Sequence, residues 1–347
     1  MTTTRQTGGS TPLKMADIAR LAQVSASTVS RALAGSALIP EAKRLEIQRI
    51  AAEAGYVVNQ SARSLRLRRT ETIAVVLPIG HEAGQLITDP FFLEMLGHLA
   101  DAITLRDYQV LITRMARTSP GWLDRIVRSQ RQDGIIVIGQ SDQHAVLNDT
   151  ASRYPAMVVW GGQIAGQRYC SVGTDNAGGG RAAVAHLLSL GRRRIAFLGQ
   201  PELPEIGLRH AGYQQALRQA GIEPDPQLLV PAHFTAEAAY EAARALAASG
   251  VPFDAVFAAS DLIALAAIKA FTAAGLRVPE DVSIVGFDDV AMAATATPAL
   301  TTIRQDLGRA ARTMVDLLFR RIAGEETPSA TLPPELVVRA SCAQTIA

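Results

Sequence analysis

The sequence predicts an α/β protein in which a small all-α head precedes a larger body built on parallel sheets. In the head, apolar residues between Ile18 and Leu33 recur at helical spacing. From Thr72 onward, strand-like runs alternate with amphipathic segments, a pattern typical of parallel sheets with helices on both faces. These runs are TIAVVL, QVLIT, GIIVIG, AMVVWG, RIAFLG, AVFAAS and VSIVGFD. At 347 residues the chain exceeds the usual size of one core, so two or three folding units are expected.

The composition excludes several classes of protein. No apolar run approaches the roughly 18 uncharged residues that a membrane span needs, and the polar start MTTTRQTGGSTPLK lacks the apolar core of a secretory signal. We therefore expect residues 1–12 to form a disordered arm and the protein to stay in the cytoplasm, with no membrane partner. Because Cys170 and Cys342 lack the spacing of a zinc site or a disulfide framework, no metal and no cofactor are expected.

The segment MADIARLAQVSASTVSRAL has the pattern of two short helices joined by a tight turn. A third helix is expected over about Pro40 to Ala54, because proline stands at its start and Gly55 follows its end. Together these helices form the predicted head, residues 13–58. Its expected core residues are Ile18, Leu21, Val24, Val29 and Leu33 from the first two helices and Leu45, Ile47 and Ile50 from the third.

The second helix of this motif is the part that can enter a DNA major groove. Ser25 is a plausible N-cap, which places five residues on the first turns, where a recognition helix contacts DNA. These are Ala26, Ser27, Thr28, Ser30 and Arg31. Arg31 is best suited to read a base, because its planar guanidinium can pair with guanine O6 and N7. The alternatives for Arg31 are a phosphate contact or a surface ion pair.

Charge and a second motif also indicate DNA. Residues 1–70 carry eleven basic and four acidic side chains, a formal +7, whereas the whole chain is only +2 and the body is therefore acidic. In NQSARSLRLRRT, Asn59 can cap a short helix containing Ala62, Arg63 and Leu65. An exposed leucine among arginines suits an apolar wedge between base pairs in the minor groove. The alternative is a basic tether whose leucine packs on the neighbouring domain.

These motifs resemble the lactose-repressor and galactose-repressor (LacI/GalR) family of bacterial transcription factors. The resemblance runs from about Leu13 to Ser341 and also rests on VGTDNAGGGRAAVAHLLSLGRRRIAFLG, RHAGYQQAL, SDLIALAAIKAF, VPEDVSIVGFDD and TPALTTIRQD. It implies a homodimer that reads a palindromic double-stranded operator. It further implies that residues 59–70 form a hinge helix and linker, and that Leu65 of each hinge helix inserts at the operator centre with Ala62 beside it.

The resemblance also implies an effector-binding and dimerisation body, residues 71–347, made of two lobes with a ligand cleft between them. The first lobe is expected to hold about 72–169 plus 299–328, and the second about 170–297 plus 329–347. The chain ends shortly after VVRASC without a leucine-rich tail helix, so we expect a dimer and not a tetramer. Control is expected to be allosteric, with the effector altering lobe orientation and thereby operator affinity.

Six residues of the body are candidates for effector binding. The resemblance implies roles for Arg209, which would grip hydroxyls or a carboxylate, for Asp288, and for Phe91 and Phe92 at the first-lobe side of the cleft. Ser260 stands where many sugar-responsive members have asparagine. Trp160 ends a predicted strand and could stack on a sugar ring. The competing interpretation is a surface ion pair for Arg209 and a turn or cap for Asp288. For the three aromatic residues it is ordinary core packing.

The function predicted is a DNA-binding regulator, a repressor of carbohydrate-utilisation genes controlled by a small sugar. One alternative is a regulator that answers to a purine or sugar phosphate corepressor. A sugar-binding protein without a regulatory role would need an export signal and no head, and is disfavoured. We expect no enzyme, because NAGGG fits neither a dinucleotide nor a P-loop motif and the six histidines show no catalytic grouping. Gln23 stands at a turn where the family often has glycine.

Overall fold

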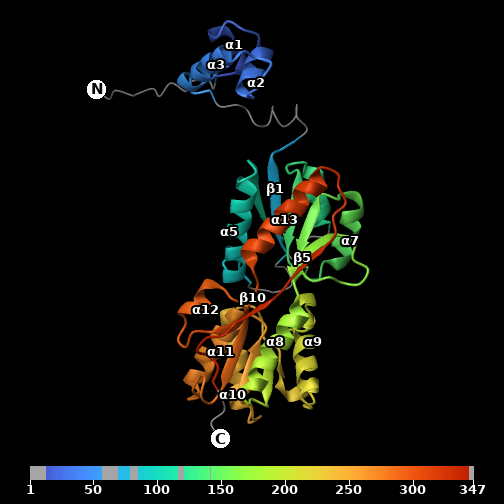
Figure 1. Cartoon of the computed structure of the whole chain (residues 1–347), viewed down its shortest axis with the longest axis vertical. Coiled ribbons are helices and arrows are strands. Elements are labelled where there is room, and N and C mark those ends of the chain that lie inside the picture. Colours follow the sequence, from blue (N-terminus) through green and yellow to red (C-terminus); the bar gives the residue numbers. More distant parts are fainter. Residues whose placement is uncertain (1–12, 57–68, 79–84, 116–120, 141, 344–347) are drawn as a thin grey trace, which may run out of the picture. The chain divides into compact units, whose positions relative to one another are not determined.

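The computed structural model of the chain describes residues 13–56, 69–78, 85–115, 121–140 and 142–343. The chain divides into two compact units, Met1–Thr70 and Glu71–Ala347, which we call the head and the body and describe separately (Figure 1). Within the described ranges, no helix is both long enough and apolar enough to cross a membrane. The α/β fold class predicted from the sequence is confirmed.

In its described part, the head contains the helices α1 (Met15–Leu21), α2 (Ala26–Leu33) and α3 (Glu41–Glu53). The turn between α1 and α2 places Gln23 in the left-handed region, with φ of 53°. Ser25 caps α2 as predicted, because its hydroxyl accepts a hydrogen bond from the backbone N–H of Thr28 at 3.1 Å. Beyond α3, Gly55 has φ of 64°, which glycine adopts at little cost.

Two of the residues expected in the core of the head lie on its surface. Leu21 is 58% exposed and Leu45 is 56% exposed, so both predictions were wrong. The helices are short and approach one another closely, and alanines therefore take inward positions that leucines would overfill. The buried residues are Ile18, Ala19, Ala22, Val29, Ala32, Ile39, Ile47 and Ala51, with Val24, Leu33 and Ile50 packed against them.

Within the described residues, the body holds two six-stranded sheets, and each belongs to one lobe. The first-lobe sheet has the order β11-β5-β4-β3-β1-β2 and is parallel throughout. Its strands are β1 (Thr72–Leu77), β2 (Gln109–Arg114), β3 (Gly134–Ile138), β4 (Met157–Trp160), β5 (Cys170–Thr174) and β11 (Ala330–Leu332).

The second-lobe sheet has the order β12-β10-β9-β8-β6-β7 and is parallel except for the pairing of β10 with β12. Its strands are β6 (Ile195–Leu198), β7 (Leu229–Val230), β8 (Ala255–Ala258), β9 (Ser283–Asp288), β10 (Thr301–Arg304) and β12 (Glu335–Val337). Parallel strands end at the same sheet edge, so side chains that follow several strands are brought together there.

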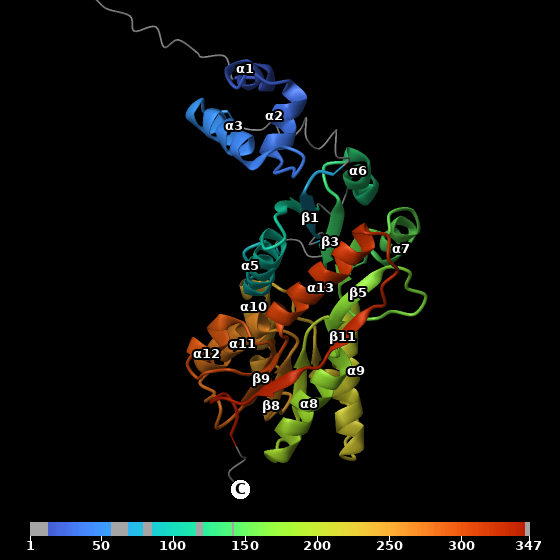
Figure 2. The same cartoon turned by 45° about the horizontal axis from the view of Figure 1, so that its top comes forward.

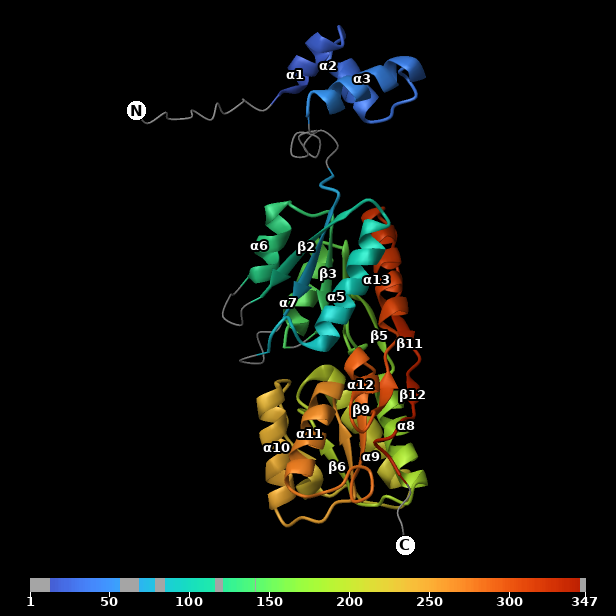
Figure 3. The ribbon, with the colours of Figure 1, turned by 90° about the vertical axis from the view of Figure 1, so that its left-hand side faces the viewer.

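Helices cover both faces of the first-lobe sheet. Ile73 and Val75 of β1 face a core shared with α5 (Pro90–Thr104) and α13 (Leu307–Ile322). The alternate residues Ala74 and Val76 face a second core, shared with α6 (Trp122–Ser129) and α7 (His144–Arg153). Figure 3 shows α5 and α13 side by side on one face, with α6 and α7 on the other. This explains why β1 reads as a continuous apolar run.

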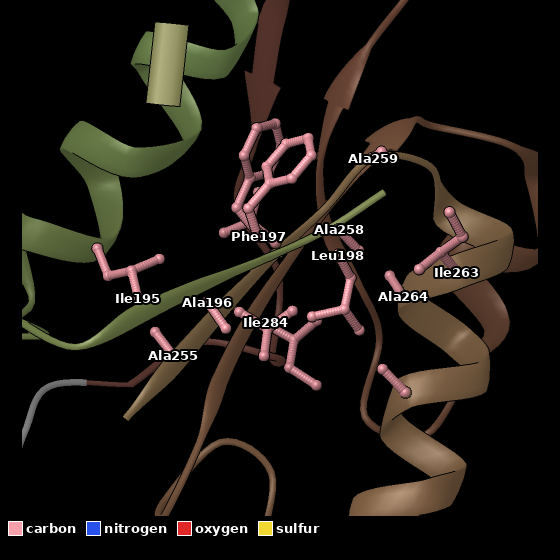
Figure 4. Close-up of a cluster of buried hydrophobic side chains, with 14 of the residues drawn as sticks. Ile195, Ala196, Phe197, Leu198, Ala255, Ala258, Ala259, Ile263, Ala264 and Ile284 are labelled. Carbon is pink, nitrogen blue, oxygen red and sulfur yellow. The ribbon is translucent and has the colours of Figure 1, made fainter. Parts of the chain in front are cut away.

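The second lobe is also a three-layer arrangement. Helix α8 (Asn176–Ser189) packs beside α9 (Pro204–Gln219), and α10 (Ala236–Ala248) packs beside α11 (Asp261–Ala273). Its core combines apolar residues of the strands with those of α11, including Phe197, Ile284 and Ile263 (Figure 4). The lobe also contains the short helix α12 (Ala291–Thr295) and a 3₁₀ turn, Pro226–Leu228.

The chain passes between the lobes at three points, and these differ from the boundaries expected from the sequence. Residues 170–174 pair with β4 and belong to the first lobe, residues 301–304 pair with β9 in the second, and residues 330–332 pair with β5 in the first. The crossings therefore fall between β5 and α8, between β10 and α13, and between β11 and β12 (Figure 2). The expected boundaries were wrong because these strands carry little apolar alternation: CSVGT and TTIR contain buried polar residues, and ATL is only three residues long.

Candidate functional site

A cavity of about 110 Å³ opens between the two lobes, at the ends of strands from both sheets. A volume of this kind holds several water-sized groups, and a single water needs about 10–15 Å³. Its walls combine apolar and aromatic side chains with a few polar ones, as in small-molecule sites generally. The lining residues are Pro78, Gln85, Asp89, Phe91, Phe92, Ile138, Gly139, Trp160, Leu203, Glu205, Ile206, Arg209, Phe234, Ser260 and Asp288.

All six effector-site candidates line this one cavity, although the first of them lies 197 positions before the last. The first-lobe wall includes Phe91 and Phe92 from the first turn of α5 and Trp160 from the end of β4. The second-lobe wall takes Arg209 from the middle of α9, and Ser260 and Asp288 from the residues that follow or end β8 and β9. Their contact with a ligand stays a prediction.

Arg209 is buried and held on several sides. Its Nε donates to Asn176 Oδ1 at 2.8 Å and its Nη1 donates to the carbonyl of Ala259 at 2.5 Å. The guanidinium carbon lies 3.7 Å from the centre of the Phe287 ring, a cation–π contact. Burial lowers the pKa of the guanidinium, and the nearby carboxyl groups of Asp288 and Glu205 oppose that effect.

Asp288 ends β9 in a strained backbone conformation. Its φ is 125°, a region that residues with a Cβ rarely adopt, and such strain is often found at functional sites. Its Oδ1 accepts a hydrogen bond from Gln305 Nε2 at 2.7 Å and lies 3.8 Å from Arg209 Nη1. Burial raises the pKa of this carboxyl well above its usual range, while the positive charge of Arg209 acts in the opposite direction.

Three aromatic side chains meet at the first-lobe wall. Phe91 lies 5.7 Å from Phe92 in an edge-to-face arrangement and 6.3 Å from Trp160, both measured between ring centres. Phe92 and Trp160 are only 8% and 5% exposed and are also part of the first-lobe core. Phe91 is half-buried, so it offers more ring surface than either neighbour.

Ser260 has a structural role that the sequence left open. Its hydroxyl accepts from the backbone N–H of Ile263 at 3.2 Å and caps α11. The next residue, Asp261, is fully buried and accepts hydrogen bonds from the hydroxyl of Thr302 on β10 and from the backbone N–H of Val290 at 2.9 Å. Asp261 thus ties α11 to the strand that leads into a lobe crossing.

Sequence reasoning missed two carboxylates in the cavity wall. Asp89 caps α5, and its two oxygens accept from the Phe91 backbone N–H at 3.0 Å and from Gln85 Nε2 at 3.3 Å. Glu205 lies in the first turn of α9 and accepts from the backbone N–H of Gln140, across the lobes, at 3.3 Å. An Asp-Pro helix start could have revealed the first, and the four-residue spacing to Arg209 the second.

The glycine run NAGGG packs helices closely together. A Cβ at Gly180 would lie 2.2 Å from the carbonyl oxygen of Arg209, and one at Gly212 would lie 2.1 Å from that of Ala177. These glycines therefore allow α8 and α9 to touch through their backbones. The Asp175 carboxylate caps the run by accepting from the N–H of Gly178 at 2.8 Å. In the ranges described by the structure, no group of three or more His, Cys, Asp or Glu residues could hold a metal ion.

The head displays the predicted DNA-contacting residues on α2. Ala26, Ser27 and Arg31 are exposed, while Thr28 and Ser30 are half-buried. Ser25 Oγ lies 2.8 Å from the hydroxyls of both Ser27 and Thr28, so these side chains are ordered at the start of the helix. The hinge candidates Asn59, Ala62, Arg63 and Leu65 lie outside the described residues.

Comparison with protein families gives two matches along the chain. Residues 14–59 match the family described as bacterial regulatory proteins, lacI family, and residues 184–342 match a periplasmic binding protein-like domain. The chain is 37% identical to the HTH-type transcriptional regulator CelR of Thermobifida fusca, covering 93% of this chain and 96% of that protein. It is 32% identical to the HTH-type transcriptional repressor CytR of Escherichia coli K12, covering 95% and 96%.

Solved structures agree with these matches. A lac repressor dimer bound to operator and the anti-inducer ONPF superposes with a TM-score of 0.85 at 25% identity, covering 96% of this chain and 100% of that one. A CelR–cellobiose complex superposes with a TM-score of 0.69 at 33% identity, covering 95% and 99%. Relatives over 30% identical along nearly the whole length, together with a matching head, show that the chain belongs to the lacI family of bacterial regulatory proteins and is a DNA-binding transcriptional regulator.

Proposed function

We propose that the protein is a repressor of carbohydrate-utilisation genes, released from or retained on its operator by a small sugar in the interlobe cavity. The observation that carries the proposal is the cavity itself, whose wall combines Arg209 and Asp288 with aromatic side chains such as Phe91. Carboxylate and guanidinium groups bind hydroxyls, and aromatic faces pack against the C–H groups of a sugar ring. Relatives whose structures contain cellobiose or ribose favour the same ligand class.

The proposed division of labour follows the chain. Residues 13–58 read DNA after a short arm, 59–70 form the hinge, and the body binds the effector. Arg31 would contact base edges in the major groove while Ser25, Ala26, Ser27, Thr28 and Ser30 position α2 on the duplex. Asn59, Ala62, Arg63 and Leu65 would act in the adjacent minor groove, with Leu65 as the inserted wedge. The protein would act in the cytoplasm, and the proposal gives it no catalytic role.

A homodimer is part of the proposal, because a palindromic operator needs two heads. Support comes from the outer edge of the first-lobe sheet, where β2 is the terminal strand. Leu105, Leu111 and Ile112 are 85%, 38% and 51% exposed there, although all three are apolar. Clustered exposed apolar side chains are typical of protein–protein contact surfaces. A lac repressor relative was crystallised as a dimer on operator DNA.

Effector binding would act by changing the relative orientation of the lobes. Three chain crossings and a few hydrogen bonds connect the lobes, and the cavity wall draws on both. A ligand with different affinity for two lobe orientations shifts the balance between them. A coupling free energy of about 1–3 kcal/mol is enough to change operator affinity from several-fold to over a hundredfold.

Fluorescence anisotropy on the palindromic DNA upstream of the gene tests the proposal. The full chain is bound at fixed salt, and mono- and oligosaccharides are added one at a time, starting with cellobiose and ribose. Release by one sugar supports an induced repressor, and binding only in the presence of a sugar would make it corepressor-dependent. Tight binding that no sugar alters would contradict the assignment of a sugar effector.

A further inference from the structure

We propose that Asp89 and Glu205 are specificity-determining residues that form a charge filter: they let the cavity take an uncharged polyhydroxylated ligand and exclude the phosphorylated form of the same ligand. The inference rests on the proposed effector site and narrows its ligand class. It opposes the sugar phosphate alternative that the sequence left open. The argument starts from the charges that line the cavity.

Acidic groups outnumber basic ones around the cavity. Among the described lining residues, Asp89, Glu205 and Asp288 are acidic and Arg209 is the one basic residue. Asp288 already lies 3.8 Å from the guanidinium, so this pair is close to neutral as a unit. Glu205 also acts on the Arg209 guanidinium, so Asp288 and Glu205 share this one cation, and among the described lining residues Asp89 has no basic side chain of its own. A phosphate dianion placed there would therefore meet a net negative surface.

The positions that usually bind phosphate in this kind of fold are occupied by the protein's own side chains. A helix N-terminus attracts anions through its free N–H groups and its dipole. At α5 the Asp89 carboxylate already caps the helix, and at α11 the Ser260 hydroxyl does so. Glu205 adds a negative charge within the first turn of α9. At the helix starts of α5, α9 and α11, the anion-binding position is thus either occupied by a capping side chain or next to a negative charge.

Asp89 is placed to work as an anion. Both of its oxygens accept hydrogen bonds, one from the Phe91 backbone N–H and one from Gln85 Nε2. Burial raises the pKa of this carboxyl, and the donors on both oxygens act against that rise because they favour the ionised form. Its free lone pairs can accept further hydrogen bonds from ligand hydroxyls. The same group can therefore bind an alcohol and repel a phosphate.

Arg209 is poorly placed to offset this repulsion. Bidentate capture of a phosphate needs two neighbouring N–H groups of one guanidinium. The Nε–H and one N–H of Nη1 already donate to Asn176 and to the carbonyl of Ala259, and one face of the guanidinium lies on the Phe287 ring. The Asp288 carboxylate lies 3.8 Å from Nη1, so a phosphate bound to the remaining N–H groups would meet this negative charge. Among the described residues no acceptor is bonded to Nη2, which leaves that nitrogen for a hydroxyl of an uncharged ligand.

The test compares matched pairs of ligands by isothermal titration calorimetry on the full chain. The probes are glucose with glucose 6-phosphate, ribose with ribose 5-phosphate, and cellobiose with its 6-phosphate. For the pair whose neutral member binds, we expect the phosphorylated member to bind at least tenfold more weakly. Glu205→Gln and Asp89→Asn should each reduce the ratio of the two affinities, neutral over phosphorylated, at least threefold. We call this ratio the gap. Glu202→Gln removes an exposed charge of the same segment outside the cavity and should leave the gap unchanged.

A second measurement works without knowledge of the natural sugar. In the full chain, inorganic phosphate at millimolar concentration should not raise the melting temperature of the wild type, whereas the Asp89→Asn, Glu205→Gln double variant should gain a phosphate-dependent rise. Equal or tighter binding of a phosphorylated sugar to the wild type would overturn the filter and leave the effector site standing. A gap that both variants leave intact would overturn the assignment to these residues. If no probe binds and the double variant ignores phosphate, the filter and the effector site fail together.

Discussion

The backbone N–H of Ala291, at the start of α12 in the second lobe, donates a 2.7 Å hydrogen bond to Glu94 Oε1 on α5 of the first lobe. Together with the bond from the Gln140 N–H to Glu205, it joins the lobes through side chains as well as through the chain crossings. Neither Glu94 nor Ala291 lines the cavity. The pair therefore stabilises the lobe arrangement that frames the cavity without touching a ligand there.

Replacing Glu94 tests whether lobe arrangement controls effector affinity. Glu94→Ala removes a hydrogen bond to a charged acceptor, a contribution of about 1.5–3 kcal/mol. We expect effector affinity to fall at least fivefold. Because the effector and operator sites are thermodynamically coupled, operator affinity in the presence of effector should change as well. Glu94→Gln keeps an accepting oxygen and should lie near wild type. Identical calorimetric affinities for all three proteins would show that this contact does not set the arrangement.

The free energy of unfolding should fall more when one partner of the Arg209–Asp288 pair is replaced than when both charges are removed together. Arg209→Met leaves the Asp288 carboxyl buried without its cation, which costs about 3–5 kcal/mol in comparable cases. Adding Asp288→Asn should restore a large part of the free energy of unfolding while the effector response stays lost. Urea unfolding of the two single variants and the double variant measures the coupling. Simple additivity of the two costs would show that the pair does not interact.

Much of the fold was accessible from the sequence because its signals are local. The apolar runs of β1, β3 and β8 are buried on both faces, so they are recognisable without knowing their neighbours. The lobe boundaries depend on β5, β10 and β11. Each of β5 and β10 continues the sheet of the strand before it, whereas β11 pairs with β5, which lies far earlier in the chain. Ser171 and Thr302 are buried within these strands, and such polar residues interrupt the apolar run by which a buried strand is recognised.

The cavity shows the same division. Arg209 and Asp288 were predicted from family motifs. Asp288 ends β9 and Arg209 lies in the middle of α9, and both line the cavity. Asp89 and Glu205 were not predicted, because a carboxylate in a helix first turn is ordinarily read as a cap. Only the packing of the first lobe on the second places both on one cavity.

Asp261 should make the stability of the body depend on pH. Burial raises the pKa of this carboxyl from 3.8 to about 7, and the charge of Asp289 acts in the same direction. Because the folded pKa is raised, its contribution to stability is fully present below about pH 3.8 and is lost as the pH rises through about 7. Asp261→Asn mimics the protonated acid and should flatten this part of the pH profile measured by urea unfolding.

Asp281 provides a control of opposite sign. Its hydrogen bonds and ion pair with Arg277 lower the pKa of the Asp281 carboxyl to about 2, so its small contribution is present above pH 3.8 and is lost as the pH falls. Asp281→Asn should therefore leave the slope between pH 5 and 7 unchanged. An unaltered slope in Asp261→Asn would contradict the assignment of that slope to Asp261.

Gln23 is a position where the head can be stabilised. Its φ of 53° strains a residue that has a Cβ, whereas glycine adopts this conformation freely. We expect Gln23→Gly to stabilise the head by about 1 kcal/mol, whereas Gln23→Ala keeps the Cβ and should give no gain. Hydrogen exchange of the α1 and α2 amides in the full chain should slow about fivefold in the glycine variant. Unchanged exchange would show that the turn relaxes without cost.

Arg31 is the residue on which base readout is expected to depend most. It is exposed on α2, and among the described residues its guanidinium has no hydrogen-bonded or ion-pair partner, so it is available to DNA. Arg31→Lys keeps the charge but loses bidentate pairing with guanine, which is worth about 1–3 kcal/mol of discrimination. Operator affinity should therefore fall about tenfold or more while affinity for scrambled DNA at the same salt is nearly unchanged. Arg49 on α3 is paired with Glu53 at 2.8 Å. Arg49→Lys therefore serves as the control and should leave the preference for operator over scrambled DNA unchanged. If Arg31→Lys weakens binding to both DNAs equally, or to neither, Arg31 contacts phosphate or solvent, and the readout must lie in the hydroxyls of α2 and in the shape of the DNA.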